Sequence, residues 1–275
     1  MLKIPMSVEK LLKSSPQCSA LIEAHHQDQK NIEAKDLDES REKLNHLLKK
    51  IAIKPSKTSS TAKERLEKKI SKLELKIKKH SSEKLHDYDY RIYPLFYAPI
   101  VVQGPNGEPI LKPMRFQCLP QGKDEQYDKK HSLYKAKKES LTEKYFERIR
   151  KNSASPSVWE PLFGSKHGIL ILNGFFEFNK IKKTVGFQTK KGDFMLVPCI
   201  YDQWTSKDGQ QDFESFAVIT EKSSTVVEES GYHRSPVILK ERHFSSWLNP
   251  KGLSNEELHN ILEDKIQDPY IPIAS

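Results

Sequence analysis

Residues 93–119 read YPLFYAPIVVQGPNGEPILKPMRFQCL and decide the fold class of this 275-residue chain. The run Tyr93–Val102 is aromatic and β-branched, which is typical of a strand. Pro105–Glu108 then contains an Asn-Gly pair of the kind that closes hairpins, and Pro109–Leu119 returns as a second strand. The segment therefore predicts a β-hairpin at the start of a strand-rich domain.

More short strands are expected downstream of this hairpin. Their apolar patterns lie at Gly168–Phe178, Thr184–Thr189, Phe194–Tyr201 and Glu214–Thr220, with turns at Asn179-Lys180 and Lys191-Gly192-Asp193. A helix is expected over Lys138–Arg150, with Leu141, Tyr145 and Ile149 on one face, and another opens at Ser254 with a capping box to Glu257. Many short strands with few helices predict an α+β domain with a curved or barrel-like antiparallel sheet.

Upstream, two helical stretches fill the chain to about residue 86. Apolar residues recur at helical spacing in the first, at Leu37, Leu44, Leu47, Leu48 and Ile51. After the break at Pro55–Ser60, a second helix is expected to open with a capping box of Thr61 and Glu64. Its seam consists of Leu66, Ile70, Leu73 and Ile77. We expect an antiparallel hairpin, packed on itself, on the domain or on a second copy, and we divide the chain into a helical region, 1–88, and an α+β domain, 89–275.

Composition narrows the class of protein. No apolar run approaches the ~18 residues of a membrane-spanning helix, and Met1–Lys13 lacks a secretory apolar region. The cysteines Cys18, Cys118 and Cys199 are odd in number and have no Cys-x-x-Cys spacing. This pattern argues against a disulfide framework and a zinc site, and it favours a reducing compartment. The histidines have no partners at metal-ligand spacing, so we expect no metal and no cofactor.

Positive charge is unevenly distributed. The net charge is +9, and residues 91–155 carry 13 Lys and Arg against 7 Asp and Glu, whereas residues 156–275 carry 13 against 16. Between Lys129 and Lys151 nine basic residues alternate with Tyr134, Tyr145 and Phe146. Lysines attract phosphates and aromatic rings stack on unpaired bases, so a nucleic-acid surface is one interpretation. The other is an ordinary helix whose aromatic residues face the core while its lysines face water.

Two titratable side chains stand next to apolar segments. Glu177 ends the run Leu172–Phe178, where burial would raise the pKa of its carboxyl and suit it to proton transfer. The alternative is a strand residue that points into solvent. His233 and Arg234 precede the short apolar run Val237–Leu239, and His233 is either an acid–base group or a surface loop residue.

Taken in order, these segments resemble the SRAP family, the SOS-response-associated peptidases or abasic-site processing proteins, in its branch with a helical insertion. The matching motifs span roughly residues 93–250: Tyr97–Pro99, Lys112–Phe116, Tyr134–Leu141, Phe163–Gly168, Asn173–Glu177, Ser215–Thr220, His233–Pro236 and Trp247–Pro250. Each motif is weak alone, but the ordered set is fairly specific.

The resemblance implies binding of single-stranded DNA that contains abasic sites, in the damage response. In the family, a Cys exposed after the initiator Met forms an imine through its α-amine and then a thiazolidine crosslink; an α-amine with a pKa near 8 suits this reaction. Glu177 is expected to orient the amine and move protons, and His233 to assist opening of the sugar ring. DNA contacts are expected from Lys135, Lys137, Arg115, Asn173 and Arg234. The implied location is the cytoplasm, at the bacterial nucleoid during action on DNA.

The sequence also departs from the family pattern. It begins Met1-Leu2, so we expect the first strand and the crosslinking Cys to be missing, and Cys18 would provide an α-amine only after cleavage. The family's Tyr-Asn-Ala-Arg reads Tyr134-Lys135-Ala136-Lys137, which keeps positive charge but loses the amide and the guanidinium fork. Two rival hypotheses stay open: a noncovalent DNA-binding remnant, and an interaction protein that acts through its helical hairpin.

Overall fold

The computed structural model of the chain describes residues 2–3, 16–54, 56–80, 91–153, 155–178, 184–190, 193–267 and 269–273. The chain divides into two compact units, one of Met1–Ser19 with Asp87–Ser275 and the other of Ala20–His86. The expected turns at Asn179-Lys180 and Lys191-Gly192 lie outside the described residues. Among the helices described, none is both long enough and apolar enough to cross a membrane.

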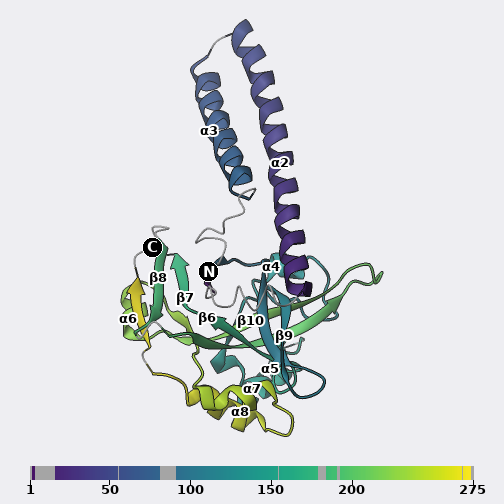
Figure 1. Cartoon of the computed structure of the whole chain (residues 1–275), viewed down its shortest axis with the longest axis vertical. Helices are drawn as coiled ribbons and strands as arrows, with labels where there is room; N and C mark the ends of the chain where they lie inside the picture. The colour runs from purple at the N-terminus through teal and green to yellow at the C-terminus, as the bar shows by residue number, and fades with distance from the viewer. Residues whose placement is uncertain are drawn as a thin grey trace. The chain divides into compact units, whose positions relative to one another are not determined.

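Five strands of the first unit close into a barrel (Figure 1). They are β3 (Tyr97–Gln103), β4 (Pro109–Phe116), β6 (His167–Leu172), β9 (Met195–Thr205) and β10 (Asp212–Lys222). Their order is β10-β4-β3-β6-β9, and the pairing of β9 with β10 completes the ring. The structure thus confirms the predicted α+β class and the barrel-like sheet, including the hairpin of β3 and β4.

Strand β10 has more partners than its neighbours. It pairs antiparallel with β9 and with β11 (Arg234–Pro236), and parallel with β4 and with the short β5 (Lys135–Lys137). The sheet is antiparallel as expected, except where β4 and β5 pair parallel with β10. Parallel neighbours need a long connection between them, and the chain from β4 to β10 provides one because β6 and β9 lie within it.

A second sheet has the order β12-β8-β7-β1-β2. Its strands are β1 (Leu2–Lys3), β2 (Arg91–Ile92), β7 (Gly174–Phe178), β8 (Thr184–Thr189) and β12 (Tyr270–Ile273). The single strand expected over Gly168–Phe178 is instead two, because the chain leaves the barrel after Leu172 and enters this sheet at Gly174. A Cβ at Gly174 would lie 3.0 Å from the carbonyl oxygen of Phe187, so glycine permits the close approach of β7 and β8.

Strand β1 was not among the strands expected from the sequence. Strand β1 pairs with β7 on one side and with β2 on the other, with Leu2 opposite both Phe175 and Ile92. Two residues are too short for apolar alternation to identify a strand, so the sequence contains no pattern from which β1 is predictable.

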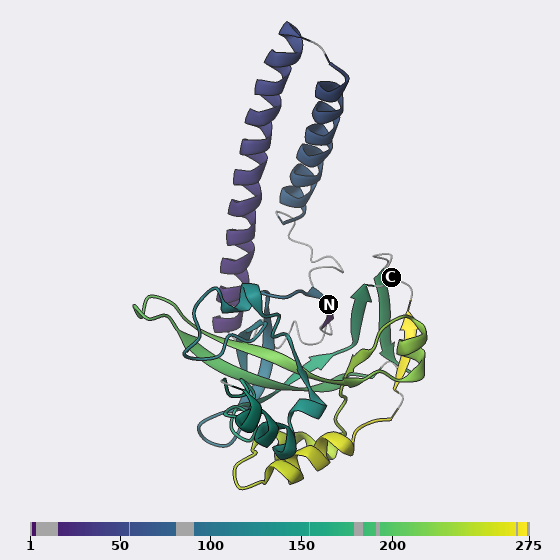
Figure 2. The same cartoon turned by 180° about the vertical axis from the view of Figure 1, so that it is seen from behind.

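Helices cover one end of the barrel (Figure 2). They are α5 (Glu143–Asn152), α7 (Phe244–Leu248) and α8 (Asn255–Glu263), while the short α4 (Tyr127–Lys130) and α6 (Thr225–Glu229) belong to loops. The predicted capping box of Ser254 and Glu257 is confirmed. The helix expected from Lys138 begins only at Glu143, because Thr142 caps it and Lys138–Ser140 form a 3₁₀ turn in which Lys138 is held by Glu221 and Glu263.

Two apolar clusters form the core of this unit. One lies between the barrel and the second sheet and contains Phe116, Phe175, Phe187 and Phe216; the other lies under the helices around Phe146 and Trp247. His167 is buried in the second cluster, where its ring stacks on Trp247 with centroids 4.0 Å apart. Its Nε2 accepts from the Gly164 amide at 3.0 Å, and its Nδ1 is 3.1 Å from the Trp247 carbonyl oxygen. The ring is therefore a neutral structural element.

The second unit is the predicted helical hairpin, formed by α2 (Pro16–Ile53) and α3 (Lys57–His80), which run side by side in opposite directions (Figure 1). Along the predicted seams Leu37 and Leu73 are buried, whereas Leu48 is 40% exposed. The capping box at Thr61 is wrong, because the helix begins four residues earlier. There the Ser56 Oγ accepts from the Ser59 amide and the Ser59 Oγ accepts from the Ser56 amide.

The burial of His167 predicts a pH-dependent loss of stability. Burial lowers the pKa of its imidazole from 6.5 to about 4, so between these values the unfolded chain binds a proton that the folded chain does not. The free energy of unfolding should fall as the pH decreases from 6.5 to 4, by about 3 kcal/mol in total.

The measurement is urea unfolding of the wild type and of His167→Phe between pH 7 and pH 4.5. The variant should be less stable at pH 7, because the Gly164 amide loses its acceptor, and the gap should narrow as the pH falls. A gap that stays constant with pH would contradict the neutral, buried imidazole.

Candidate functional site

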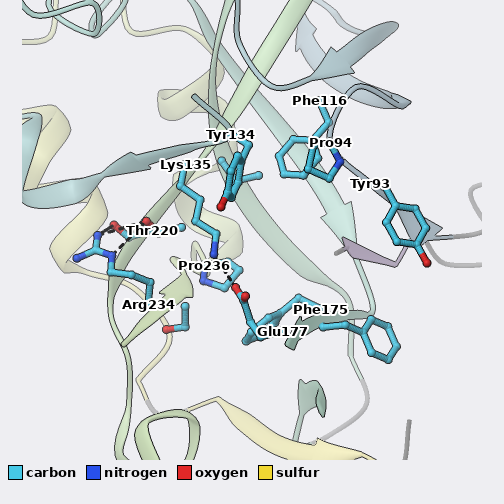
Figure 3. A pocket seen from close by; sticks show the side chains of 13 residues that line it. Tyr93, Pro94, Phe116, Tyr134, Lys135, Phe175, Glu177, Thr220, Arg234 and Pro236 are labelled. Carbon is cyan, nitrogen blue, oxygen red and sulfur yellow. Dashed lines mark hydrogen bonds and ion pairs between the residues drawn. The ribbon is translucent and has the colours of Figure 1, made fainter. Parts of the chain in front are cut away.

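A pocket opens where the second sheet meets strands β5, β10 and β11 of the first unit (Figure 3). Its volume is about 150 Å³. The lining is largely apolar and aromatic, with a few polar groups: Tyr93, Pro94, Phe116, Tyr134, Lys135, Phe175, Phe176, Glu177, Val218, Thr220, Arg234, Ser235 and Pro236. A concave, mostly apolar site with few convergent polar groups is the usual form of a ligand site.

Lys135 and Glu177 meet inside this pocket. The Nζ of Lys135 lies 2.6 Å from Oε1 of Glu177, and the two side chains point toward each other (Figure 3). They retain 29% and 22% of their side-chain exposure, so the pair is partly shielded from water but reachable from it. The contact joins β5 of the barrel region to β7 of the second sheet, two strands 42 residues apart in the chain.

Strand alternation explains why Lys135 points into the pocket. Ala136 is fully buried against the core, which places Lys135 and Lys137 on the opposite face of β5. The register sets Lys135 beside Val218 and Lys137 beside Thr220 of β10. Lys137 is exposed and does not line the pocket, so it lies one strand repeat beyond the pocket on the same face.

Aromatic rings form the wall beside the pair. Tyr134 packs edge-on against Phe116, with ring centroids 6.0 Å apart, and Lys135 Nζ lies 5.4 Å from the centroid of the Tyr134 ring. Phe175 and Phe176 precede Glu177 on β7 and are both almost fully buried. The carboxylate is therefore at the point where an apolar strand reaches the pocket.

Arg234 lines the pocket, but its guanidinium is already bound to protein groups. It donates to the carbonyl oxygen and to Oγ1 of Thr220, and pairs with Glu139 at 3.0 Å. Thr220 is buried, so these bonds satisfy a carbonyl that water does not reach.

The other predicted site residues lie outside the pocket lining. The His233 side chain is 77% exposed, with Nδ1 3.9 Å from a Glu228 carboxylate oxygen. Arg115 lies on β4 with its guanidinium 4.2 Å from the centroid of the Phe213 ring. Asn173 occupies the junction of β6 and β7, where its Oδ1 is buried and has no hydrogen-bond partner among the described residues. The structure therefore brings together Lys135, Glu177 and Arg234.

Sequence reasoning missed several pocket residues. Tyr93 and Pro94 belong to the aromatic run that was assigned to a strand, and Thr220 ends a strand motif. Only tertiary pairing places them together, since no spacing along the chain marks them.

In the basic stretch between Lys129 and Lys151, Phe146 is fully buried, while Arg150 pairs with Glu143 and Glu160. For α5 the structure therefore favours an ordinary helix with an aromatic residue in the core over a helix whose aromatic residues are available to bases.

The cysteines with described side chains, Cys118 and Cys199, are buried and unpaired. Burial raises the pKa of the Cys118 thiol to about 12 and that of Cys199 above its ordinary range, so both thiols stay protonated and unreactive. In the part of the chain that the structure describes, no three His, Cys, Asp or Glu side chains are grouped to hold a metal ion.

The family model that matches this chain and the names of similar proteins point to the same family. The family model described as "SOS response associated peptidase (SRAP)" matches residues 56–271. Abasic site processing protein YobE of Bacillus subtilis is 28% identical over 168 residues, which cover 59% of this chain and 68% of YobE. Abasic site processing protein YoqW of the same organism is 27% identical over 148 residues, which cover 52% of this chain and 59% of YoqW.

Solved structures share the fold. A protein from Bacteroides thetaiotaomicron aligns with a TM-score of 0.50 at 22% identity, over 66% of this chain and 75% of its own. A protein from Bordetella bronchiseptica aligns with a TM-score of 0.50 at 15% identity, over 70% of this chain and 89% of its own.

The bonds of Arg234 predict a structural cost for its removal. Arg234→Met should lower the free energy of unfolding by about 1–3 kcal/mol, because the buried Thr220 carbonyl loses a charged donor. Lys251→Met, at an exposed turn, is the control and should change stability by less than about 0.5 kcal/mol. Equal denaturation midpoints for the two variants would show that the Arg234 guanidinium does not contribute to the stability of the folded chain.

Proposed function

The chain belongs to the SOS response associated peptidase (SRAP) family, and on this premise we propose that it binds single-stranded DNA at abasic sites in the damage response. The proposal draws on the curated relatives, which are named abasic site processing proteins. The observation that carries it is the pocket in which Lys135 and Glu177 meet.

The size of the pocket fits a sugar remnant. At about 150 Å³ it is smaller than the ~300–1,000 Å³ of pockets that hold drug-sized ligands. A deoxyribose that has lost its base is of that smaller scale, whereas an intact nucleotide with its base is not. The pocket therefore favours an abasic position over an ordinary one.

Charge and aromatic surface around the pocket suit an unpaired strand. Lys137 projects from the same face as Lys135, about 6.6 Å further along β5, and is placed to reach a phosphate next to the bound sugar. Tyr93 and Tyr134 offer ring faces or edges to neighbouring bases, a sequence-tolerant contact that requires bases free of a duplex.

The chemistry we propose for the site is proton transfer at the sugar. An abasic deoxyribose opens to an aldehyde, and opening moves a proton between two sugar oxygens. Glu177 is the carboxylate at the pocket that can accept and return this proton. His233 immediately precedes the pocket residue Arg234, and its exposed ring is available to DNA that lies across the rim, so we keep it as the second proton-transfer candidate.

The family's thiazolidine chemistry needs a thiol next to an α-amine. Cys118 and Cys199 do not satisfy this requirement, because both are internal and buried. We base the proposed function on the pocket itself, through recognition of the abasic sugar and through the carboxylate of Glu177.

Binding should be selective and salt-dependent. In a native gel, the 275-residue chain should retain a single-stranded oligonucleotide with one abasic site more strongly than the intact oligonucleotide or its duplex. The logarithm of the binding constant should fall linearly with the logarithm of salt concentration, by about 0.7 per phosphate neutralised.

Charge reversal at Lys137 tests the proposed path of the strand. Lys137→Glu should weaken binding about tenfold and make the salt dependence shallower, because a phosphate contact is replaced by repulsion. Lys251→Glu makes the same charge change at an exposed turn outside the pocket lining. If both variants bind equally well, or if abasic and intact strands bind alike, the proposed function is wrong.

A further inference from the structure

We propose that the Nζ of Lys135 is a nucleophile that forms an imine with the C1′ aldehyde of a ring-opened abasic site. The inference rests on the proposed function, since it requires that the abasic sugar enters this pocket. It adds a covalent step and assigns that step to a particular amine.

The position of Lys135 carries the argument. Among the described residues that line the pocket, it is the one primary amine. Arg234 is the other cation there, but a guanidinium stays protonated in proteins, and this one is bound to Thr220 and Glu139. An aldehyde held in the pocket would therefore meet Lys135 before any other amine of the lining.

The partner of Lys135 supplies what imine formation needs. A lysine ammonium must lose a proton before it attacks, and Glu177 Oε1 lies 2.6 Å from it. The same pairing occurs outside the pocket between Lys112 and Glu214, at 2.8 Å. A lysine–glutamate contact alone therefore does not indicate a reactive lysine. What distinguishes Lys135 from Lys112 is its location in a pocket of the size of a sugar.

The proposed step balances in protons and charge. Lys135 gives one proton to Glu177, and the neutral amine attacks C1′ to form a carbinolamine. Glu177 then returns the proton to the departing hydroxyl, which leaves as water. The product is a protonated imine, which carries the same single positive charge as the original ammonium and lies beside a carboxylate that is again ionised.

The apolar wall favours this product. Tyr134, Phe175 and Phe176 line the pocket with the pair and limit the access of water, which is the reagent that hydrolyses an imine. The partial exposure of Lys135 leaves an entrance for the sugar, while most of the carboxylate is already covered. The arrangement thus combines access for an aldehyde with some protection for its adduct.

Borohydride trapping tests the inference. The chain is incubated with a single-stranded abasic oligonucleotide and sodium borohydride, which reduces an imine to a stable amine, and is then separated on a denaturing gel. The wild type should give a shifted band, and peptide mass mapping should place the deoxyribose remnant on Lys135. Lys135→Arg, which keeps the charge but offers no nucleophilic amine, should reduce the band at least tenfold. Lys112→Arg, the matched change in the pair outside the pocket, should leave it unchanged.

A native gel run in parallel distinguishes a failure of imine formation at Lys135 from a failure of DNA binding. Binding without a trapped band, or an adduct mapped to the α-amine or another lysine, overturns the role of Lys135 and leaves the proposed function intact. No binding of abasic DNA by the wild type overturns both. The mapping is made on the wild-type adduct, so the result does not depend on how well Lys135→Arg folds.

Discussion

The hydrogen-bonded pairing of β10 with four other strands is the constraint on which this structure depends. Residues Ser215–Thr220 in the middle of that strand are buried almost completely, so each of their backbone groups needs a partner within the protein. Strands β9, β4, β5 and β11 provide those partners in turn. The same pairings bring β5 and β11, which are nearly 100 residues apart in the chain, to the two sides of one pocket. The strand that closes the barrel therefore also brings together the elements of the site.

The pocket holds an ion pair on a largely aromatic part of the sheet surface. It requires a carboxylate and an ammonium to remain in a largely aromatic setting, where either ion alone would be costly. Mutual pairing at 2.6 Å offsets that cost, and partial exposure reduces it further. A ligand that enters must preserve this balance. An aldehyde would do so, because it is neutral when it arrives and the proposed imine would keep the positive charge beside Glu177.

Local patterns were sufficient for much of the fold. The Asn106-Gly107 turn, the apolar strands and the capping box at Ser254 all depend on neighbours within a few residues, and all were predictable. The errors have tertiary causes. Lys138 is drawn away from α5 by two distant glutamates, the strand at 168–178 divides because its halves belong to different sheets, and Ser56 caps α3 in place of Thr61. In the site, the apolar strand left Glu177 either buried or in solvent, and the family resemblance singled it out. Its contact with Lys135 was not predictable because 42 residues separate them.

The pairing of β1 with β2 also has a consequence for how this chain tolerates change. Leu2 lies opposite Ile92 and Lys3 opposite Arg91, so the two ends of the segment between these strands are adjacent in the second sheet. A segment whose two ends are adjacent can be treated as a loop inserted between two paired strands. Doubling or halving its length alters the entropy of closing the loop by only about 0.6 kcal/mol, because that entropy depends on the logarithm of length. A change in the length of this segment should therefore cost the barrel that carries the pocket little stability.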